Sequence, residues 1–108
     1  MTDIYGQLIN GEWDLGGAQT PNINPSDTSE TIGHLASATT AQVEDAIAAA
    51  RAAQPAWNAV QLEEKKNILH AIGQELIDRC DEIGKLLSSE EGKPFAEGRG
   101  ETFRAGEF

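Results

Sequence analysis

A glycine–lysine pair close to the end of the sequence is the first feature that could do chemistry. It lies in the stretch SSEEGKPFAEGRGE, residues 88–101. A P-loop requires the pattern G-x-x-x-x-G-K-[ST], in which backbone N–H groups surround the phosphates and a hydroxyl group meets Mg²⁺. Here Lys93 precedes Pro94 instead of a serine or threonine, and Leu87 occupies the position of the first glycine. The pair therefore does not predict a P-loop.

The glycines that follow also miss the dinucleotide fingerprint G-x-G-x-x-G. Gly98 and Gly100 fit its first half, but Phe103 stands where the third glycine is needed. The stretch is instead typical of a junction between helices, because glycine accepts the left-handed conformation that ends a helix and proline suits the first turn of the next. We therefore predict that one helix ends at Gly92 and that another begins near Pro94.

Cys80, the single cysteine, is a candidate nucleophile. A nucleophilic cysteine needs a base within reach and a lowered pKa. Cys80 lies at the predicted end of a helix, where the dipole disfavours a thiolate, and Asp78, Asp81 and Glu82 surround it in the sequence. We interpret it as an inert thiol, and a lone cysteine also excludes a disulfide framework.

The remaining candidates are two histidines, two adjacent carboxylates and two tryptophans: His34, His70, Glu90, Glu91, Trp13 and Trp57. The histidines lack the spacing of metal ligands. Adjacent carboxylates on a helix point in different directions, and we expect both tryptophans to pack rather than to bind a ligand. No nucleophile, base and oxyanion donor come together. The residues themselves therefore predict no catalytic, cofactor-binding or metal-binding site in this chain.

Composition and charge are those of a small soluble domain. The chain has 108 residues, of which 39% are apolar and 24% charged, and its formal net charge is −10. Such a surface repels nucleic acid and anionic lipid, and the eight lysines and arginines are scattered. No secretory signal and no apolar run long enough to span a bilayer are visible. We expect a cytoplasmic protein that binds neither nucleic acid nor membrane.

The first third of the sequence predicts strands and a loop. Residues 4–14 read as a β-hairpin around Asn10-Gly11, because both residues accept the positive φ of a type I′ turn. Residues 15–30 are rich in glycine, proline and asparagine and predict a loop. Residues 31–36 predict one short strand.

A first helix is expected from Thr39, which forms a capping box with Gln42. Pro55 is expected to end this helix, because proline lacks an N–H group and clashes with the preceding turn. Its apolar stripe is formed by Val43, Ile47 and Ala50.

Three further helices are expected over residues 62–79, from Asp81 to Gly92, and from Pro94 to the last residue, Phe108. Leu69, Ile72 and Leu76 form the stripe of the second. Because the last pattern is still helical at residue 108, we expect the sequence to be a piece of a longer chain. The predicted fold class is an α+β fragment: hairpin, loop and strand over residues 1–38, followed by about four helices over residues 39–108.

Taken in order, these segments resemble the N-terminal part of the aldehyde dehydrogenase superfamily. The resemblance is carried by INGEW (9–13), NPSD (24–27), IGHLASATTAQVEDAIAAARAAQPAW (32–57), ILHAIGQELIDRCDEIGKLLSSEEGKP (68–94) and EGRGE (97–101). Each piece alone is weak, but five in the right order and spacing are specific. The resemblance implies that E-x-G-K-P is a junction between helices rather than a catalytic loop.

The resemblance implies a larger α/β, Rossmann-like cofactor domain of which residues 1–108 form the N-terminal, supporting portion. The enzymes of that family oxidise aldehydes to carboxylic acids with NAD or NADP, through a cysteine thiolate and a glutamate. Both residues lie beyond this segment in family members, so Cys80 does not match the nucleophile. The resemblance therefore assigns no catalytic, cofactor-binding or metal site here, and no cofactor is expected for this chain alone. Similarity in detail to members acting on carboxylated semialdehydes, such as 2-oxoglutarate semialdehyde, indicates a substrate class for the parent.

Two hypotheses stay open at this point. The chain is either the inactive structural portion of an NAD(P)-dependent aldehyde dehydrogenase or a self-standing acidic helical module that binds a protein partner without catalysis. Under the first, its partner is the remainder of its own subunit or another copy of itself, and the parent is a homo-oligomer. Apolar side chains are then expected to lie uncovered in the isolated chain, namely Trp13, Ile32, Phe95, Phe103 and Phe108.

Overall fold

The computed structural model describes residues 3–108, which form five short strands and four helices. This is the predicted α+β fragment. The chain divides into two compact units. The first holds the residues up to Ile23 together with residues 29–60, and the second holds residues 24–28 together with residues 61–108.

A three-stranded sheet lies in the first unit, in the order β1 (Ile4–Tyr5), β5 (Thr31–Ala36), β4 (Gln19–Ile23). Strand β1 pairs parallel to β5 and β4 pairs antiparallel to it. The prediction of a continuous loop over residues 15–30 was wrong, because β4 lies within it. Its sequence QTPNI hides the strand, since proline is common only at sheet edges, and β4 is an edge strand.

The predicted hairpin is confirmed in a shorter form, as β2 (Gln7–Ile9) paired with β3 (Glu12–Asp14). Asn10 and Gly11 have φ angles of 51° and 83°, as the type I′ turn requires. The first two residues of the predicted hairpin instead form β1. The break falls at Gly6, where a Cβ atom would overlap the carbonyl oxygen of Asp14, so only glycine fits between the two strands.

Helix α1 (Thr40–Ala59) begins with the predicted capping box. The N–H group of Gln42 donates to Thr39 Oγ1 at 3.2 Å, and the N–H group of Thr39 donates to Gln42 Oε1 at 2.8 Å. The prediction that Pro55 ends the helix was wrong, because the helix continues to Ala59. Proline removes only one helical hydrogen bond, and the residues after it still form the last turn of the helix. That turn ends with a hydrogen bond from Val60 N–H to the Trp57 carbonyl at 3.2 Å.

The predicted apolar stripe of α1 is not its packed face in this chain. Gln42 is buried and Ala46 and Ala49 are half-buried, whereas Val43 and Ile47 are exposed. The hydrophobic pattern therefore marks a face that this chain leaves uncovered.

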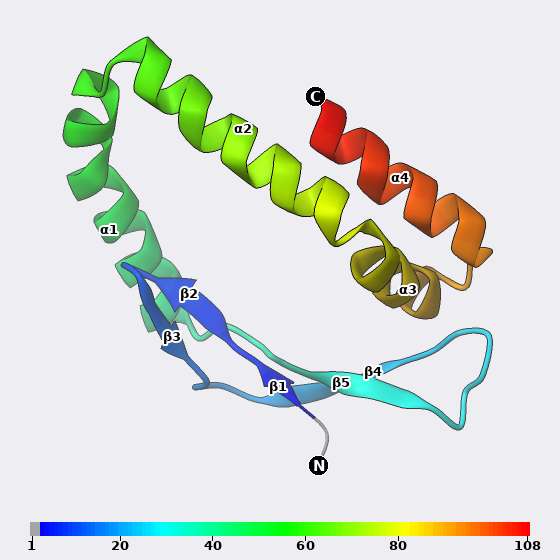
Figure 1. Cartoon of the computed structure of the whole chain (residues 1–108). Helices are drawn as coiled ribbons and strands as arrows, with labels where there is room; N and C mark the ends of the chain where they lie inside the picture. The colour runs from blue at the N-terminus through cyan, green and yellow to red at the C-terminus, as the bar shows by residue number, and fades with distance from the viewer. Residues whose placement is uncertain (1–2) are drawn as a thin grey trace. The chain divides into compact units, whose positions relative to one another are not determined.

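Three helices make up most of the second unit: α2 (Leu62–Asp78), α3 (Cys80–Glu91) and α4 (Phe95–Glu107) (Figure 1). Arg79 alone separates α2 from α3 and is the cap residue of both. The prediction that Asp81 caps the third helix was wrong, since Asp81 lies within α3, where it forms an ion pair with Arg99. Gly92 ends α3 in the left-handed conformation with φ of 75°, as predicted.

Residues 24–28 join these helices as a tight turn. The N–H group of Ser26 donates to the side-chain oxygen of Asn24 at 2.8 Å, and Asp27 N–H donates to the Asn24 carbonyl at 3.2 Å. The turn lies against the helix junction, since a Cβ atom on Gly92 would come within 3.1 Å of Pro25 Cγ.

Helix α4 packs against α2 and α3 through pairs of glycines. A Cβ atom on Gly84 would lie 2.5 Å from the Cα atom of Arg99, and one on Gly98 would lie 2.6 Å from the Gly84 carbonyl oxygen. Along α2 the same relation joins Gly73 and Gly106, with the added Cβ 2.6 Å from the Gly106 carbonyl oxygen. These helices therefore touch backbone to backbone, and no other residue type fits at the contacts.

The apolar core of the described residues is small. Only Ala36 and Cys80 are buried among the apolar residues, and no large side chain is fully buried. Of the side chains expected to be uncovered, four are exposed: Trp13, Phe95, Phe103 and Phe108. Ile32 differs, because it is half-buried on the central strand β5.

Substitution of Gly84 tests the backbone contact. We expect Gly84→Ala to lower the free energy of unfolding by about 1–3 kcal/mol, because the added methyl group meets Arg99 backbone atoms that cannot turn aside. Gly100→Ala is the matched control: nothing lies within 4 Å of its added Cβ, and alanine favours a helix by roughly 1 kcal/mol over glycine. Urea unfolding followed by far-UV circular dichroism measures both. Equal gains in stability from the two substitutions would contradict the packing.

Candidate functional site

The ammonium group of Lys93 is held between two carboxylates. Its Nζ atom lies 2.6 Å from Glu91 Oε2 and 2.7 Å from Glu101 Oε2. The hydrogen bond that Lys93 donates to Glu101, followed by the one it donates to Glu91, raises the pKa of Lys93 above its ordinary value. Lys93 therefore joins the end of α3 to α4 and its charge is neutralised, which agrees with the interpretation of this segment as a helix junction.

Cys80 is buried at the first position of α3. The sequence placed it at a helix C-terminus, but it lies at the positive end of the following helix instead. Its Sγ atom lies 3.9 Å from Asp81 Oδ1, and the charge of Arg99 is close enough to interact with it. The hydrogen-bond partner of the thiol is thus a carboxylate on the neighbouring residue, and Asp81 itself is paired with Arg99.

The two histidines lie on separate elements in separate units. His34 is on the central strand β5, where its backbone N–H group donates to the Asp3 carbonyl at 2.9 Å. His70 is exposed on α2 and lines a groove that the end of α4 completes. Within residues 3–108, no three side chains of the histidine, cysteine, aspartate and glutamate types gather closely enough to hold a metal ion.

The two tryptophans belong to the first unit and the two adjacent carboxylates to the second. Trp13 is exposed on β3 opposite Leu8, and Trp57 is half exposed in the last turn of α1. Glu91 binds Lys93, and Glu90 next to it also has an interaction partner. The structure does not bring these candidates together into one site.

A polar hollow of about 410 Å³ lies in the second unit. Its lining residues are Asn24, Ser26, Lys85, Ser88, Ser89, Lys93 and Phe95. Ser88 Oγ is buried without a hydrogen-bond partner among the described residues, and it lies against α4, 2.5 Å from where a Cβ on Gly98 would be. The hollow offers hydroxyl and ammonium groups but no carboxylate or imidazole base.

A polar cluster in the first unit centres on Gln42. Beyond the capping box, its Nε2 atom donates to the Gly16 carbonyl at 3.4 Å, and its side chain also hydrogen-bonds to Asp14. Gly16 N–H donates to Asp14 Oδ1 at 2.8 Å. The sequence identified the capping box but not the link to Asp14, because that contact depends on how the chain between Asp14 and Thr40, including β4 and β5, is folded.

None of the helices in the described part of the chain combines the length and apolar character needed to cross a bilayer. A family model described as "Aldehyde dehydrogenase family" matches residues 13–108. The chain belongs to the aldehyde dehydrogenase family. The resemblance drawn from the sequence is thereby confirmed.

Individual aldehyde dehydrogenases show the extent of the likeness. The glutarate-semialdehyde dehydrogenase of Pseudomonas putida is 38% identical over 101 residues, covering 93% of this chain and 21% of that protein. The alpha-ketoglutaric semialdehyde dehydrogenase of Bacillus subtilis is 32% identical over 104 residues, covering 94% and 21%. The solved NAD-dependent aldehyde dehydrogenase of Sinorhizobium meliloti superposes with a TM-score of 0.92 at 26% identity, covering 99% of this chain and 22% of that one. The chain therefore spans about a fifth of the length of these relatives.

The carboxylate of Asp14 provides a test of the polar cluster. We expect its pKa to lie below the ordinary 3.8, because the Gln42 side chain and the Gly16 N–H group donate to the charged form. The stability that this interaction adds is present above pH 3.8 and is lost as the pH falls through the lowered pKa of the folded state. NMR titration of the side-chain carboxyl group measures the pKa of Asp14. Gln42→Ala should raise the pKa of Asp14, whereas Gln54→Ala on an exposed part of the same helix should leave it unchanged; a value that is the same in all three proteins would contradict the cluster.

Proposed function

We propose that this chain is the N-terminal structural portion of an NAD(P)-dependent aldehyde dehydrogenase that oxidises an aldehyde to a carboxylic acid. The observation that carries the proposal is the combination of a family match over residues 13–108 with apolar faces that the chain itself leaves uncovered. Its role is to support the cofactor domain rather than to supply reacting groups. The residues 1–108 would form one part of that domain.

The proposed substrate class for the parent enzyme is a semialdehyde that carries a carboxylate. The relatives named above act, by their names, on glutarate and alpha-ketoglutarate semialdehydes. A solved aldehyde dehydrogenase 21 of Physcomitrella patens, 31% identical to this chain with a TM-score of 0.88, holds the reaction product succinate. The two semialdehydes and succinate each carry a carboxylate on a short chain, which supports this substrate class over a simple alkyl aldehyde.

NAD or NADP is proposed for the parent and not for this chain. The relatives include an NAD-dependent enzyme and an NADP-dependent succinate-semialdehyde dehydrogenase from Escherichia coli. Two observations support the proposal that the segment around Lys93 is not a phosphate site: Lys93 is neutralised by two carboxylates, and Gly98 is packed against α3. The groups that would hold the phosphates must come from other parts of the enzyme.

The proposed partner is the remainder of the same subunit, or a second copy where that remainder is absent. The parent would be a cytoplasmic homo-oligomer. The second candidate, a self-standing acidic module, is favoured by the net charge of −10 and by the well-capped α1. A reading frame that continues past residue 108 into a family cysteine and glutamate would support the first candidate and exclude the second.

The isolated chain is expected to oxidise no aldehyde. The reason is that Cys80 is buried, that its thiol contacts the carboxylate of Asp81, and that the family's nucleophile and glutamate are expected to lie outside residues 1–108. Formation of NADH or NADPH with a panel of aldehydes and semialdehydes is measured spectrophotometrically, with a full-length relative as the positive control. Turnover that Cys80→Ser abolishes would overturn this part of the proposal.

The isolated chain is also expected to associate or to remain partly molten. Covering a few hundred Å² of apolar surface at about 25 cal/mol per Å² contributes several kcal/mol. This is comparable with the whole stability of a small domain, about 5–15 kcal/mol. Sedimentation velocity, together with a dye that binds exposed apolar surface, provides the measurement. A monodisperse monomer that binds no dye and unfolds cooperatively would favour the self-standing module instead.

A further inference from the structure

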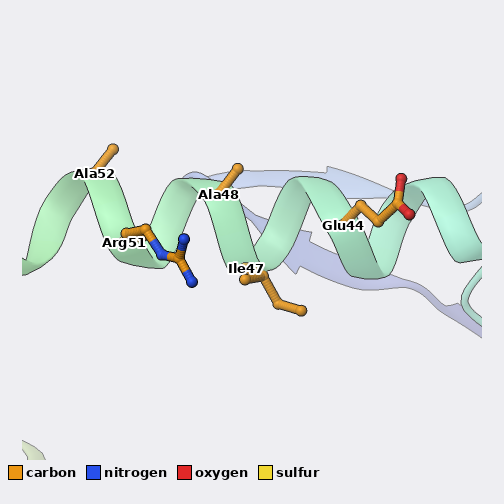
Figure 2. Close-up of a pocket in the computed structure, with 5 residues that line it drawn as sticks. All are labelled: Glu44, Ile47, Ala48, Arg51 and Ala52. Atoms are coloured by element: carbon orange, nitrogen blue, oxygen red, sulfur yellow. The ribbon is translucent and has the colours of Figure 1, made fainter.

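One face of α1 is exposed to solvent, and it lies opposite the face that is packed within the first unit. The packed face holds Gln42, Ala46 and Ala49. At about 100° per residue, Glu44 and Arg51 project from the other side of the helix, and they line a shallow hollow of about 490 Å³. Figure 2 shows them two turns apart, with the β-strands behind the helix.

The residues of this solvent face are complementary to the same residues on a second, antiparallel copy of the helix. We call them the α1 face: Val43, Glu44, Ile47, Ala48, Arg51 and Ala52. Turning the helix end for end about the midpoint between Ile47 and Ala48 sets Glu44 opposite Arg51. The same operation sets Ile47 opposite Ala48. A two-fold axis through that midpoint would therefore pair each large or charged residue with a small or oppositely charged one, as an isologous contact requires.

Both charges on the α1 face are available for a partner. Ion pairs within the described residues involve other side chains, and neither Glu44 nor Arg51 takes part in one. Between them Ile47 is 56% exposed, more than half of its surface. The short side chain of Ala48 lets a second helix approach closely, because interaxial distance depends on side-chain size at the contact.

We propose that two copies of this chain pair through the α1 face, with their helices antiparallel about a two-fold axis. Glu44 of each copy then binds Arg51 of the partner copy across the axis, and Ile47 packs on the partner's Ala48. A parallel arrangement in equivalent register would instead set like charges against each other, so the charges select the antiparallel one. The proposal deepens the self-association proposed above by naming the surface that carries it.

The expected dimer is weak. Stable interfaces bury about 800 Å² on each partner, and three turns of one helix bury less than that. Exposed ion pairs each add about 0–1 kcal/mol, so their main contribution is to fix the orientation. The net charge of −10 on each copy opposes the contact.

Charge exchange across the axis tests the proposal. Glu44→Arg and Arg51→Glu are each expected to raise the dissociation constant about tenfold or more, because each places two like-charged pairs in the interface. The double variant, with Glu44→Arg and Arg51→Glu together, has the original net charge and should return the dissociation constant to that of the unmodified chain. An equimolar mixture of the two single variants should form a heterodimer, since each then meets its opposite charge. Sedimentation equilibrium of the whole chain measures all of these.

Matched controls separate the α1 face from general charge effects. Glu64→Arg on α2 and Arg104→Glu on α4 make the same changes in net charge at exposed positions. They should leave the dissociation constant within about twofold, because they alter only the long-range repulsion that salt screens. Far-UV circular dichroism checks that every variant keeps its helices.

Three outcomes would overturn the proposal. Association that is equally strong in all charge variants would show that another apolar face carries it, while the wider proposal of self-association would stand. A chain that is monomeric at all concentrations would refute both. Failure of the double variant to recover would show that the two charges do not meet.

Discussion

The backbone contact between α4 and its two neighbours is the constraint on which the second unit depends. Glycine at both members of each pair brings the helices to a distance at which carbonyl oxygens and Cα atoms touch. Such contacts need no large apolar side chains between the helices, because dispersion contacts come from the backbone itself. This accounts for the otherwise unusual combination of ordered helices and a nearly absent buried apolar core. Several large apolar residues of these helices are exposed, among them Leu69, Ile72 and Phe103.

In the first unit a polar side chain takes the position that an apolar residue usually occupies. Gln42 is buried, and it satisfies the Thr39 N–H group while it also binds Asp14 and the Gly16 carbonyl. A buried amide is tolerated only when its donors and acceptors are paired. The helix start, the loop and the end of the hairpin are therefore tied together by hydrogen bonds, and little apolar burial is needed there. Both units are folded while large apolar side chains stay exposed, as expected of parts of a larger fold.

Local chemistry explains which features the sequence predicted. Asn10-Gly11, Thr39 with Gln42, and Gly92 each act through their own backbone, so their effects are readable without knowing the fold. Strand β4 was missed because its partner, β5, determines its conformation more than its own residues do. The helix beyond Pro55 was missed because one lost hydrogen bond did not outweigh the residues around it. That this chain holds no catalytic, cofactor-binding or metal-binding site stays a prediction from residue types and spacings. The pairing of Asp81 with Arg99 could not be predicted, because it depends on α3 and α4 lying side by side.

The turn at residues 24–28 belongs to the second unit, although the strands before and after it in the sequence belong to the first. Synthesis on the ribosome proceeds from the N-terminus, so this turn emerges long before the helix junction at Gly92 that it contacts. The turn therefore has no contact surface while β5, α1, α2 and α3 are being synthesised. The first unit can order its strands early, but the second closes only when α4, which packs against α2 and α3, has left the tunnel. The two units therefore become complete in a fixed temporal order, and a chain arrested near Val60 would present this turn without its binding surface.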